Sequence, residues 1–283
     1  MRIPVEAVPP GITLINAEKN LIAETNSVYR CEGKKNNRNV SFYMKVGKLG
    51  HETMRNEFEV LKELSGYNLP VPRVLWYSQN RREYMALSEV KGLNLSDLIN
   101  PKHPEYDQLH VYELLRRYGE VLAEIHSLPI SWEPFRRTEL YDFISDEIES
   151  EDIAVRDIVL WLQSNPPHRT PDVFVHGDLN TANVLFSRQD LAGLIDWEFA
   201  GMGWREYDLA WVLRQRKNYL NTQYERDVLL RGYLSKASFD EDALRWCEVM
   251  NYLHIAHWSG ERFPAYRVFA LEKAREMMFA GFE

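Results

Sequence analysis

One pair of neighbouring segments constrains this chain more than any other. Residues 175–186 read Val-His-Gly-Asp-Leu-Asn-Thr-Ala-Asn-Val-Leu-Phe, and residues 194–198 read Leu-Ile-Asp-Trp-Glu. They place Asp178, Asn183 and Asp196 at the ends of short apolar runs. Phosphoryl transfer from a magnesium nucleotide needs these groups, because one carboxylate must accept the proton of the attacking hydroxyl and hard oxygen ligands must hold the metal.

The spacing of Asn183 and Asp196 favours a β-hairpin. Two apolar, β-prone runs flank a polar turn at residues 187–190. Paired antiparallel with Val184 opposite Ile195, these runs bring Asn183 and Asp196 together at the open end. Directly opposed residues have Cβ atoms about 4.5–5.5 Å apart, close enough to share a cation. Chance occurrence of His-Gly-Asp in a loop, with Asx residues capping turns, explains one motif but not two at this separation.

These motifs resemble the signature of the aminoglycoside phosphotransferase family, the small-molecule branch of the protein-kinase-like fold. Members carry His-Gly-Asp-Leu-x-x-x-x-Asn, later Ile-Asp-Trp-Glu, and then Gly-x-x-x-Tyr-Asp-Leu-Ala. The corresponding segments of this chain are 176–183, 195–198 and 203–210. The first has one residue fewer after the leucine, so the Asp-to-Asn separation remains five. The resemblance implies that Asp178 is the catalytic base and that Asn183 and Asp196 are magnesium ligands.

The resemblance also implies an α+β, bilobal, protein-kinase-like fold, with a small antiparallel-sheet N-lobe that carries one helix and a larger, mainly helical C-lobe. Residues 1–91 would form the N-terminal nucleotide-binding lobe, and residues 92–283 the C-terminal catalytic and acceptor-binding lobe. His176 and Asp208 become scaffold residues, the first inside the catalytic loop and the second anchoring backbone amides. The resemblance is strong over residues 175–210 and weaker through most of the chain.

The composition predicts a soluble protein of the cytoplasm. The 283 residues are 45% hydrophobic, which is enough for two lobes with a core each. No apolar run approaches the ~20 residues of a membrane span, and the first six residues do not read as a signal peptide. The two cysteines, Cys31 and Cys247, lie far apart without metal or redox spacing, which suits a reducing compartment.

Charge is distributed unevenly along the chain. Residues 1–91 hold 14 Lys and Arg against 10 Asp and Glu, a balance of +4, and the rest of the chain carries −12. A basic first lobe suits the phosphates of a nucleotide, and an acidic second lobe suits a cationic acceptor. The pattern argues against a nucleic-acid partner, which requires a basic surface. That many soluble proteins are simply acidic is an equally good explanation.

The first ninety residues predict a strand-rich lobe that includes Lys45. Residues 28–31 and 40–46 are β-prone and flank a polar hairpin loop at 32–39. Alternation in the second strand puts Lys45 on the face opposite the most apolar side chains, where a nucleotide cleft could lie. An ammonium there can clamp phosphates if a carboxylate holds it in place. A lone strand lysine, however, is more often a solvated edge residue.

Glu57 is the candidate for that carboxylate. Apolar residues at helical spacing predict a helix over residues 51–65 that packs on the sheet, with Glu57 at the edge of its buried face. The family pattern Glu-x-x-x-Leu-x-x-Leu, which marks the partner of the lysine, is matched by Glu57, Leu61 and Leu64. Without the resemblance, Glu57 would be an ordinary exposed helix carboxylate.

The loop that would cover the phosphates departs from the kinase pattern. Kinases commonly use a glycine-rich loop there, whereas residues 24–29 of this chain contain no glycine. Family members often have a short hydroxyl-bearing loop before Val-Tyr-Arg, so Ser27 or Thr25 is expected to cap the phosphates. The alternative is that both residues only begin a strand.

Residues 84–92 resemble the inter-lobe hinge of the family. An apolar strand ends there in a short polar segment before a glycine. The backbone groups of Ser88, Glu89 and Val90 would then pair with the adenine edge, and the identity of the side chains would matter little. An ordinary exit from a strand into a loop explains the same pattern.

Beyond the hinge the sequence predicts helices. An apolar stripe of period 3.6 between Val111 and Leu128 marks a central core helix. His126, near its end, is expected to be a hydrogen-bonded core histidine rather than a catalyst. Further helices are predicted at 206–219, 222–235, 240–258 and 264–279.

Clues to the acceptor are acidic and aromatic. Carboxylates between residues 139 and 152 suit the ammonium groups of an aminoglycoside, at ~1.5–3 kcal/mol per charge-assisted hydrogen bond, although a charge run is more often a solvated face. The family places Asp-Pro after Gly203, where this chain has Trp204 and Arg205. The candidate acceptor-binding residues are Asp146, Glu147, Glu149, Glu151, Trp204, His257 and Trp258.

Together the patterns predict an ATP-dependent small-molecule kinase that uses Mg²⁺ and ATP, with GTP as the alternative nucleotide. It would move the γ-phosphate to a hydroxyl of a small, cationic, aminoglycoside-like molecule. Choline-, homoserine- or sugar-type alcohols are rival acceptors, and the expected partner is this alcohol rather than a nucleic acid or a membrane. A catalytically idle nucleotide-binding module is a further alternative, although the five predicted site residues are intact. A magnesium-dependent hydrolase would leave Lys45 and Glu57 without a task.

Overall fold

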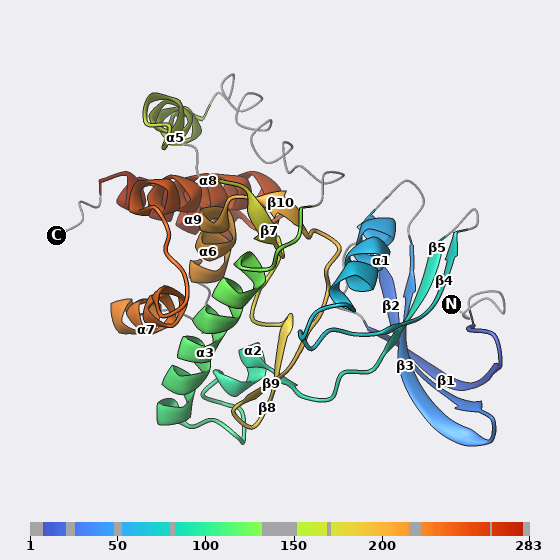
Figure 1. Cartoon of the computed structure of the whole chain (residues 1–283). Coiled ribbons are helices and arrows are strands. Elements are labelled where there is room, and N and C mark those ends of the chain that lie inside the picture. The colour runs from blue at the N-terminus through green and yellow to red at the C-terminus, as the bar shows by residue number, and fades with distance from the viewer. Residues whose placement is uncertain are drawn as a thin grey trace. The chain divides into compact units, whose positions relative to one another are not determined.

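The chain folds into two compact units. The computed structural model describes residues 8–20, 26–47, 53–79, 83–131, 152–168, 171–214, 222–260 and 262–279. One unit comprises residues 1–95 together with the later segment 182–200, and the other comprises residues 96–181 and 201–283. The described part of the first unit is mainly strands and that of the second is mainly helices (Figure 1). The α+β class expected from the sequence is therefore confirmed.

Segment 182–200 belongs to the first unit because backbone hydrogen bonds tie it there. Strand β6 (Leu93–Asn94) pairs antiparallel with β8 (Val184–Ser187), which pairs with β9 (Asp190–Leu194). The amide of Leu194 also donates to the carbonyl of Pro70 at 2.8 Å. The sequence division at residue 91 treated the chain as two continuous pieces and did not foresee this return of the chain.

A five-stranded antiparallel sheet forms the body of the first unit. Its strand order is β1-β2-β3-β5-β4, and every neighbouring pair is antiparallel. Buried side chains such as Phe42, Met44 and Cys31 form a core cluster on this sheet. The strands are β1 (Ile12–Asn20), β2 (Ser27–Lys35), β3 (Arg38–Val46), β4 (Val74–Gln79) and β5 (Glu83–Ser88).

The hairpin between β2 and β3 is tighter than the sequence indicated. The expected loop at 32–39 shortens to a turn at Asn36 and Asn37, with Lys35 paired to Arg38. Both turn residues have positive φ, 49° and 60°. A two-residue turn of type I′ requires this conformation, which asparagine tolerates well. Polar composition had marked the whole segment as a loop, although most of it is paired strand.

Helix α1 (Thr53–Leu64) packs against β4 and β5. Its buried stripe includes Met54, Leu61 and Leu64, as the helical spacing predicted. Phe58 is half-buried and stacks on Tyr77 of β4, with ring centroids 4.2 Å apart. Helix α1 also buries two polar residues, Asn56 and Glu57, which are important for the site described below.

The hairpin of β8 and β9 differs from the predicted register by one residue. Val184 pairs with Leu194 rather than with Ile195, and an irregularity lies between Leu185 and Phe186. Near the turn Phe186 pairs with Leu191, and past the irregularity the pairing moves one residue along β9, which still leaves Val184 one residue short of Ile195. Ile195 instead donates its amide to the carbonyl of Asn183 at 3.0 Å, so the open end of the hairpin still joins the two segments.

The second unit is a helical assembly with a short two-stranded sheet. Long helices α8 and α9 pack together, α6 packs on α8, and α3 packs on α7 (Figure 1). The elements are α2 (Leu95–Leu98), α3 (Gln108–His126), α5 (Ile153–Ser164), β7 (Val173–Val175), β10 (Gly201–Gly203), α6 (Arg205–Leu213), α7 (Gln223–Leu234), α8 (Glu241–Ser259) and α9 (Pro264–Phe279). Helix α6 ends earlier than the predicted span 206–219, and residues 215–221 lie outside the described residues.

Helices α3 and α7 approach closely because each contributes a glycine to the contact. A Cβ added to Gly119 would lie 2.1 Å from the carbonyl oxygen of Leu229, and one added to Gly232 would lie 2.0 Å from that of Arg116. Only residues without a side chain allow this backbone approach. The contact brings the ends of α3 and α7 together beside the catalytic-loop scaffold.

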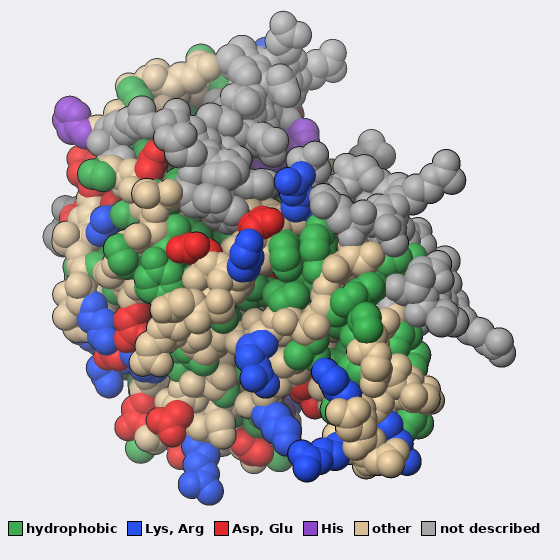
Figure 2. Space-filling model, turned by 45° about the vertical axis from the view of Figure 1, so that its right-hand side comes forward, with side chains coloured by type: hydrophobic (Ala, Val, Ile, Leu, Met, Phe, Trp, Pro, Cys, Tyr) green, Lys and Arg blue, Asp and Glu red, His purple; other side chains and the backbone are tan. Residues whose placement is uncertain are grey.

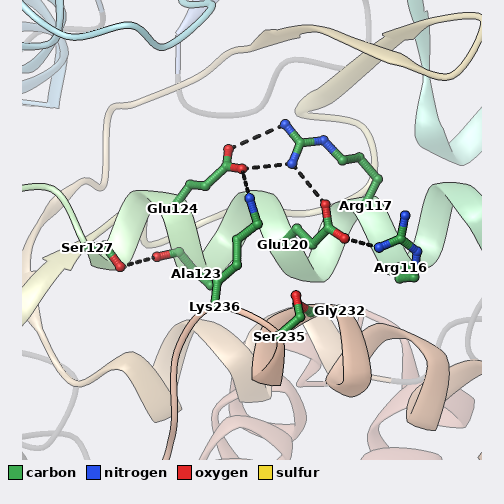
Figure 3. Close-up of polar contacts among 9 residues, drawn as sticks. All are labelled: Arg116, Arg117, Glu120, Ala123, Glu124, Ser127, Gly232, Ser235 and Lys236. Atoms are coloured by element: carbon green, nitrogen blue, oxygen red, sulfur yellow. Dashed lines mark hydrogen bonds and ion pairs between the residues drawn. The ribbon is translucent and has the colours of Figure 1, made fainter.

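Ion pairs on α3, one of which reaches the segment after α7, lie at the polar side of the same helix pair (Figure 3). Glu124 of α3 accepts from Arg117 Nη1 at 2.7 Å and from Lys236 Nζ, beyond the end of α7, at 2.6 Å. Glu120 accepts from Arg116 and Arg117. These partly exposed pairs each contribute little, about 0–1 kcal/mol, so the glycine contact decides the spacing.

The surface is mixed in character. On the face shown in Figure 2, Lys and Arg side chains lie among Asp, Glu and hydrophobic side chains. Among the helices that the structure describes, none combines the length and the apolar character that crossing a bilayer requires.

Candidate active site

The loop that follows β7 carries Asp178, and α6 fixes its backbone. Asp208 of α6 accepts the amide of His176 through Oδ2 at 2.7 Å and the amide of Gly177 through Oδ1 at 2.8 Å. Gly177 has φ +83°, a conformation in which glycine bears no steric cost. Asp208 is fully buried and therefore needs such donors. The expected anchoring role of Asp208 is confirmed.

A buried polar chain extends this anchor into the helices. His126 of α3 lies between Asp208, at 3.4 Å from its Nε2, and the hydroxyl of Tyr233 of α7, at 2.9 Å from its Nδ1. The Tyr118 hydroxyl donates to the carbonyl of Leu179 in the loop itself. His126 is thus a hydrogen-bonded core histidine, as predicted, and the α3–α7 pair supports the loop from behind.

Two neutral donors hold the side chain of Asp178. Trp211 of α6 donates its indole Nε1–H to Oδ1 at 2.7 Å. The Asn180 amide lies 3.1 Å from Oδ1 and 3.2 Å from Oδ2. His176 is buried, and its Nδ1 accepts the amide of Asp178 at 3.3 Å. Trp211 and Asn180, neither of which carries a formal charge, thus both orient the carboxylate, which is half-buried rather than sealed from solvent.

In the first unit, Lys45 lies between two carboxylates. Its Nζ is 2.6 Å from Glu57 Oε2 and 2.6 Å from Asp196 Oδ1. Burial acts to lower the pKa of Lys45, but the charges of Asp196, Glu57 and Glu198 outweigh it and hold the pKa above its usual value. Burial raises the pKa of Glu57, which Lys45 opposes. The predicted contact between Lys45 and Glu57 is present, while its role toward phosphates stays a prediction.

Asp196 and Asn183 have the character of a magnesium site. Asn183 is buried, whereas the side chain of Asp196 is 35% exposed and its backbone has φ +68°, an unusual conformation for a residue other than glycine. No group of three or more His, Cys, Asp or Glu that could enclose a metal occurs in the described ranges. Mg²⁺ commonly uses one or two protein oxygens and takes the rest from phosphates and water. Asn183 and Asp196 fit that pattern.

Three carboxylates near one ammonium also favour a cation here. Glu57, Asp196 and Glu198 all act on Lys45, which leaves an excess of negative charge. Glu57 Oε1 is buried and has no hydrogen-bond partner in the part of the chain that the structure describes. A bound divalent ion would offset such an excess and supply charge neutralisation to a phosphoryl group.

Asn26 and Asn56 hold the segment that follows Asp196, and sequence reasoning missed both. Asn26, in the turn before β2, donates to Glu198 Oε2 at 2.8 Å. Asn56 of α1 donates to the carbonyls of Glu198 and Ala200 at 3.0 and 2.9 Å. Both asparagines are buried. The only signals in the sequence were the position of Asn56 beside Glu57 and that of Asn26 beside Ser27.

The predicted nucleotide-contacting residues lie at strand ends. Ser27 begins β2 and pairs with Val46, and Thr25 lies outside the described residues. At the end of β5, the amide of Ser88 donates to the carbonyl of Arg73 at 2.9 Å, so this amide is already engaged. The Glu89 side chain accepts from Arg30 Nε at 2.8 Å. The predicted roles of Ser27, Ser88, Glu89 and Val90 toward the nucleotide remain predictions.

The aromatic acceptor candidates belong to helix ends. Trp204 precedes α6 and lies 6.1 Å from the ring of Trp246 in α8. His257 and Trp258 are exposed near the end of α8, where Trp258 stacks on Phe263 at 5.9 Å. The acidic candidates Asp146, Glu147, Glu149 and Glu151 lie outside the described residues.

Asp152, the last carboxylate of the acidic stretch, has a structural role. It caps the first turn of α5 and forms an ion pair with Arg267 at 2.7 Å. These contacts, first of all the hydrogen bond from Arg267, hold its pKa below the usual value.

Comparison with solved structures agrees with this architecture. A thermostable mutant of aminoglycoside phosphotransferase APH(4)-Ia, in a ternary complex with ADP and hygromycin B, aligns with a TM-score of 0.67 at 15% identity. The alignment covers 96% of both chains. The fold is therefore the bilobal protein-kinase-like fold expected from the sequence. Fold and site residues define the class, a small-molecule phosphotransferase with an alcohol group as acceptor.

The chain belongs to the phosphotransferase enzyme family, whose model matches residues 21–247. An aminoglycoside 3'-phosphotransferase of Niallia circulans is 27% identical over 210 residues, which span 69% of this chain and 76% of that protein. A homoserine kinase of Sinorhizobium fredii is 31% identical over 126 residues, which span 41% of this chain and 37% of that protein. The relatives thus share the phosphotransfer class and differ in the acceptor.

Proposed function

We propose that this protein transfers the γ-phosphate of ATP to a hydroxyl of a small, cationic, aminoglycoside-like molecule. Asp178 orients the acceptor hydroxyl and accepts its proton. Asn183 and Asp196 hold Mg²⁺, and Lys45, braced by Glu57, steadies the phosphates. Most of the rate enhancement then comes from positioning and charge neutralisation rather than from covalent chemistry.

The observation that carries this proposal is the buried Lys45 with its two carboxylates, each at 2.6 Å. Burying an ammonium is costly unless it is paired, and a pair with excess negative charge stays costly without a further cation. A magnesium nucleotide supplies both the cation and the phosphates for the lysine. A magnesium-dependent hydrolase gives neither Lys45 nor Glu57 a function, so it accounts for less of the structure.

An idle nucleotide-binding module accounts for Lys45 but not for the Asp178 loop. The loop backbone is held by a fully buried aspartate, and the carboxylate is held by two further donors. Such preorganisation of one side chain serves a reaction rather than nucleotide binding alone. The structure therefore favours an active enzyme over this alternative.

The acceptor proposal rests on charge and on relatives. Residues 92–283 carry −12, and one relative is an aminoglycoside 3'-phosphotransferase. The homoserine kinase match supports an amino-acid alcohol as the main rival, with choline- and sugar-type alcohols behind it. ADP in the complex of APH(4)-Ia supports an adenine nucleotide, with GTP as the alternative to test.

The direct test is a screen of aminoglycosides, amino-acid alcohols, choline and sugars for release of ADP or GDP. Wild-type protein should turn over at least one acceptor with Mg²⁺, and Asp178→Asn should not. Failure of wild-type protein with every acceptor, or equal rates for both proteins, would reject the proposed reaction.

The charge of the acceptor has a separate test. Because the Debye length falls from ~30 Å at 0.01 M to ~8 Å at physiological salt, KM for a cationic acceptor should rise over that range. Changing Asp146, Glu147, Glu149 and Glu151 to amides should raise this KM and flatten its salt dependence. Equivalent changes at Glu113, Glu241, Glu272 and Glu276, exposed helix residues, serve as the control. Equal behaviour of both variants would assign the acidic stretch to a solvated surface.

A further inference from the structure

Helix α6 makes two contacts with the Asp178 loop from one of its faces. Asp208 binds the backbone amides of His176 and Gly177, and Trp211 binds the Asp178 carboxylate. Residues three apart in a helix are neighbours on its surface. A single rigid element therefore positions both the backbone of the loop and the side chain that the loop carries.

The indole of Trp211 is itself in contact with two other side chains. The guanidinium of Arg214 lies 3.9 Å from the ring centroid, and Arg214 is only 5% exposed. Tyr207, one turn earlier on α6, stacks on the ring at 6.4 Å with an interplanar angle of 21°. A cation at this distance attracts the face of an indole. The N–H thus points at Asp178 from a ring with little freedom to rotate.

The hydrogen bond from Trp211 to Asp178 Oδ1 is 2.7 Å long, shorter than the 3.1 and 3.2 Å contacts that Asn180 makes with the same carboxylate. Asn180 belongs to the loop and moves with it, whereas Trp211 belongs to α6. An indole N–H donates a hydrogen bond but does not ionise. It therefore orients the carboxylate without protonating it, and the carboxylate can take its proton from the acceptor hydroxyl. A charged donor in the same place would compete for that oxygen much more strongly.

We propose that Trp211 is a positioning residue of the phosphotransfer reaction: its indole N–H sets the rotamer of the Asp178 carboxylate, and Arg214 and Tyr207 fix the ring that carries it. This inference rests on the proposed role of Asp178 as the base. It goes beyond that role because it identifies the residue that orients the carboxylate of the base.

The test is Trp211→Phe, which keeps an aromatic ring for Arg214 and Tyr207 and removes only the donor. The turnover number should fall by about 10- to 100-fold, the scale of one hydrogen bond to a charged group, while KM for ATP stays within about twofold. Because the donor favours the ionised carboxylate, its loss should also move the acid limb of the kcat–pH profile to higher pH. A purely structural role predicts lower stability without the shift of the pH profile.

Trp161→Phe is the matched control. Trp161 of α5 also has a guanidinium near its ring, that of Arg245 at 5.7 Å, and has no assigned role in the site. Its kcat and pH profile should match those of wild type. Equal effects of the two substitutions on kcat and on the acid limb would overturn the proposal, even if Asp178→Asn proves inactive.

A second measurement decides the question without any activity. In ¹⁵N spectra, the indole resonance that disappears in Trp211→Phe belongs to Trp211. Its proton should exchange slowly with solvent in wild type and faster by at least about tenfold in Asp178→Ala, with the Trp161 indole unchanged. An unchanged exchange rate of the Trp211 indole proton in Asp178→Ala would overturn the proposal. Faster exchange in a protein that phosphorylates no acceptor would reject the proposed function, but the contact between Trp211 and Asp178 would stand.

Discussion

Asp196 in the first unit and Asp178 in the second are both predicted site carboxylates, yet their surroundings differ in charge. Asp196 pairs with the ammonium of Lys45, and Glu57 and Glu198 add negative charge around the same ammonium. Two of the groups that hold Asp178, an indole and an amide, are neutral. One carboxylate lies in a charged cluster, and neutral donors help to set the direction of the other.

The difference shows how the same residue type can serve two tasks. A metal ligand benefits from surrounding charge, because the ion is held by several oxygens and balanced by their total. A general base must be ionised, oriented and able to accept a proton, which neutral donors permit. A third aspartate, Asp208, is buried against backbone amides and serves as scaffold. Environment rather than residue type separates the three.

The largest expected effect comes from removing the charge of the base. Asp178→Asn should keep ATP binding and lower turnover by about 10²–10⁴-fold, the usual scale of general acid–base catalysis. Steady-state kinetics with the best acceptor and calorimetry with ATP check the two parts. Unchanged turnover would show that Asp178 is not the general base, and the proposed difference in task between Asp178 and Asp196 would then be wrong.

Asp196→Ala should have the opposite signature, a loss of magnesium-dependent ATP binding. The substitution removes one oxygen ligand and a negative charge that only a cation can offset. Calorimetry with Mg-ATP, and with ATP plus a chelator, separates the metal from the nucleotide. Identical affinities of wild type and variant in both conditions would count against the metal role.

The Lys45–Glu57 pair should behave as one unit. Lys45→Met and Glu57→Gln each leave a buried polar partner without its pair. Each should therefore lower kcat/KM, and each should lower the free energy of unfolding by about 3–5 kcal/mol, the scale for breaking a buried pair. Because both remove the same contact, the double variant should lose less than the sum of the single losses. Strictly additive losses would mean that the two residues act independently, despite their 2.6 Å separation.

Asn56→Leu tests the support of the segment that follows Asp196, a predicted magnesium ligand. The carbonyls of Glu198 and Ala200 would lose their donor, at a cost of roughly 1–3 kcal/mol in the free energy of unfolding. KM for Mg-ATP should rise, with a smaller effect on the Asp178 step. Arg55→Leu, at the exposed neighbouring position of α1, is the control. Denaturant unfolding that does not distinguish the two variants would show that α1 does not hold this segment.

Much of the architecture follows from local patterns. The stripe of α1 and the period of α3 gave elements within a few residues of the observed ones, because burial of one face is encoded at fixed spacing. The β8–β9 hairpin was also predicted, but its register was wrong by one residue. Neither the register nor the irregularity has a reliable sequence signal, because the pairing that forms depends on packing against the rest of the unit.

The sequence by itself predicted the chemistry, since Asp178, Asn183 and Asp196 lie in short motifs whose spacing a hairpin and a loop can satisfy. Only the tertiary structure decided what aims and supports them. Trp211 reaches Asp178 across 33 residues, and Asn26 and Asn56 reach Glu198 across 172 and 142. Hydrogen bonds between such distant residues form only after packing has brought their elements together. The periodicity of a sequence does not predict such hydrogen bonds, because a single buried amide or indole produces no repeating pattern along the chain.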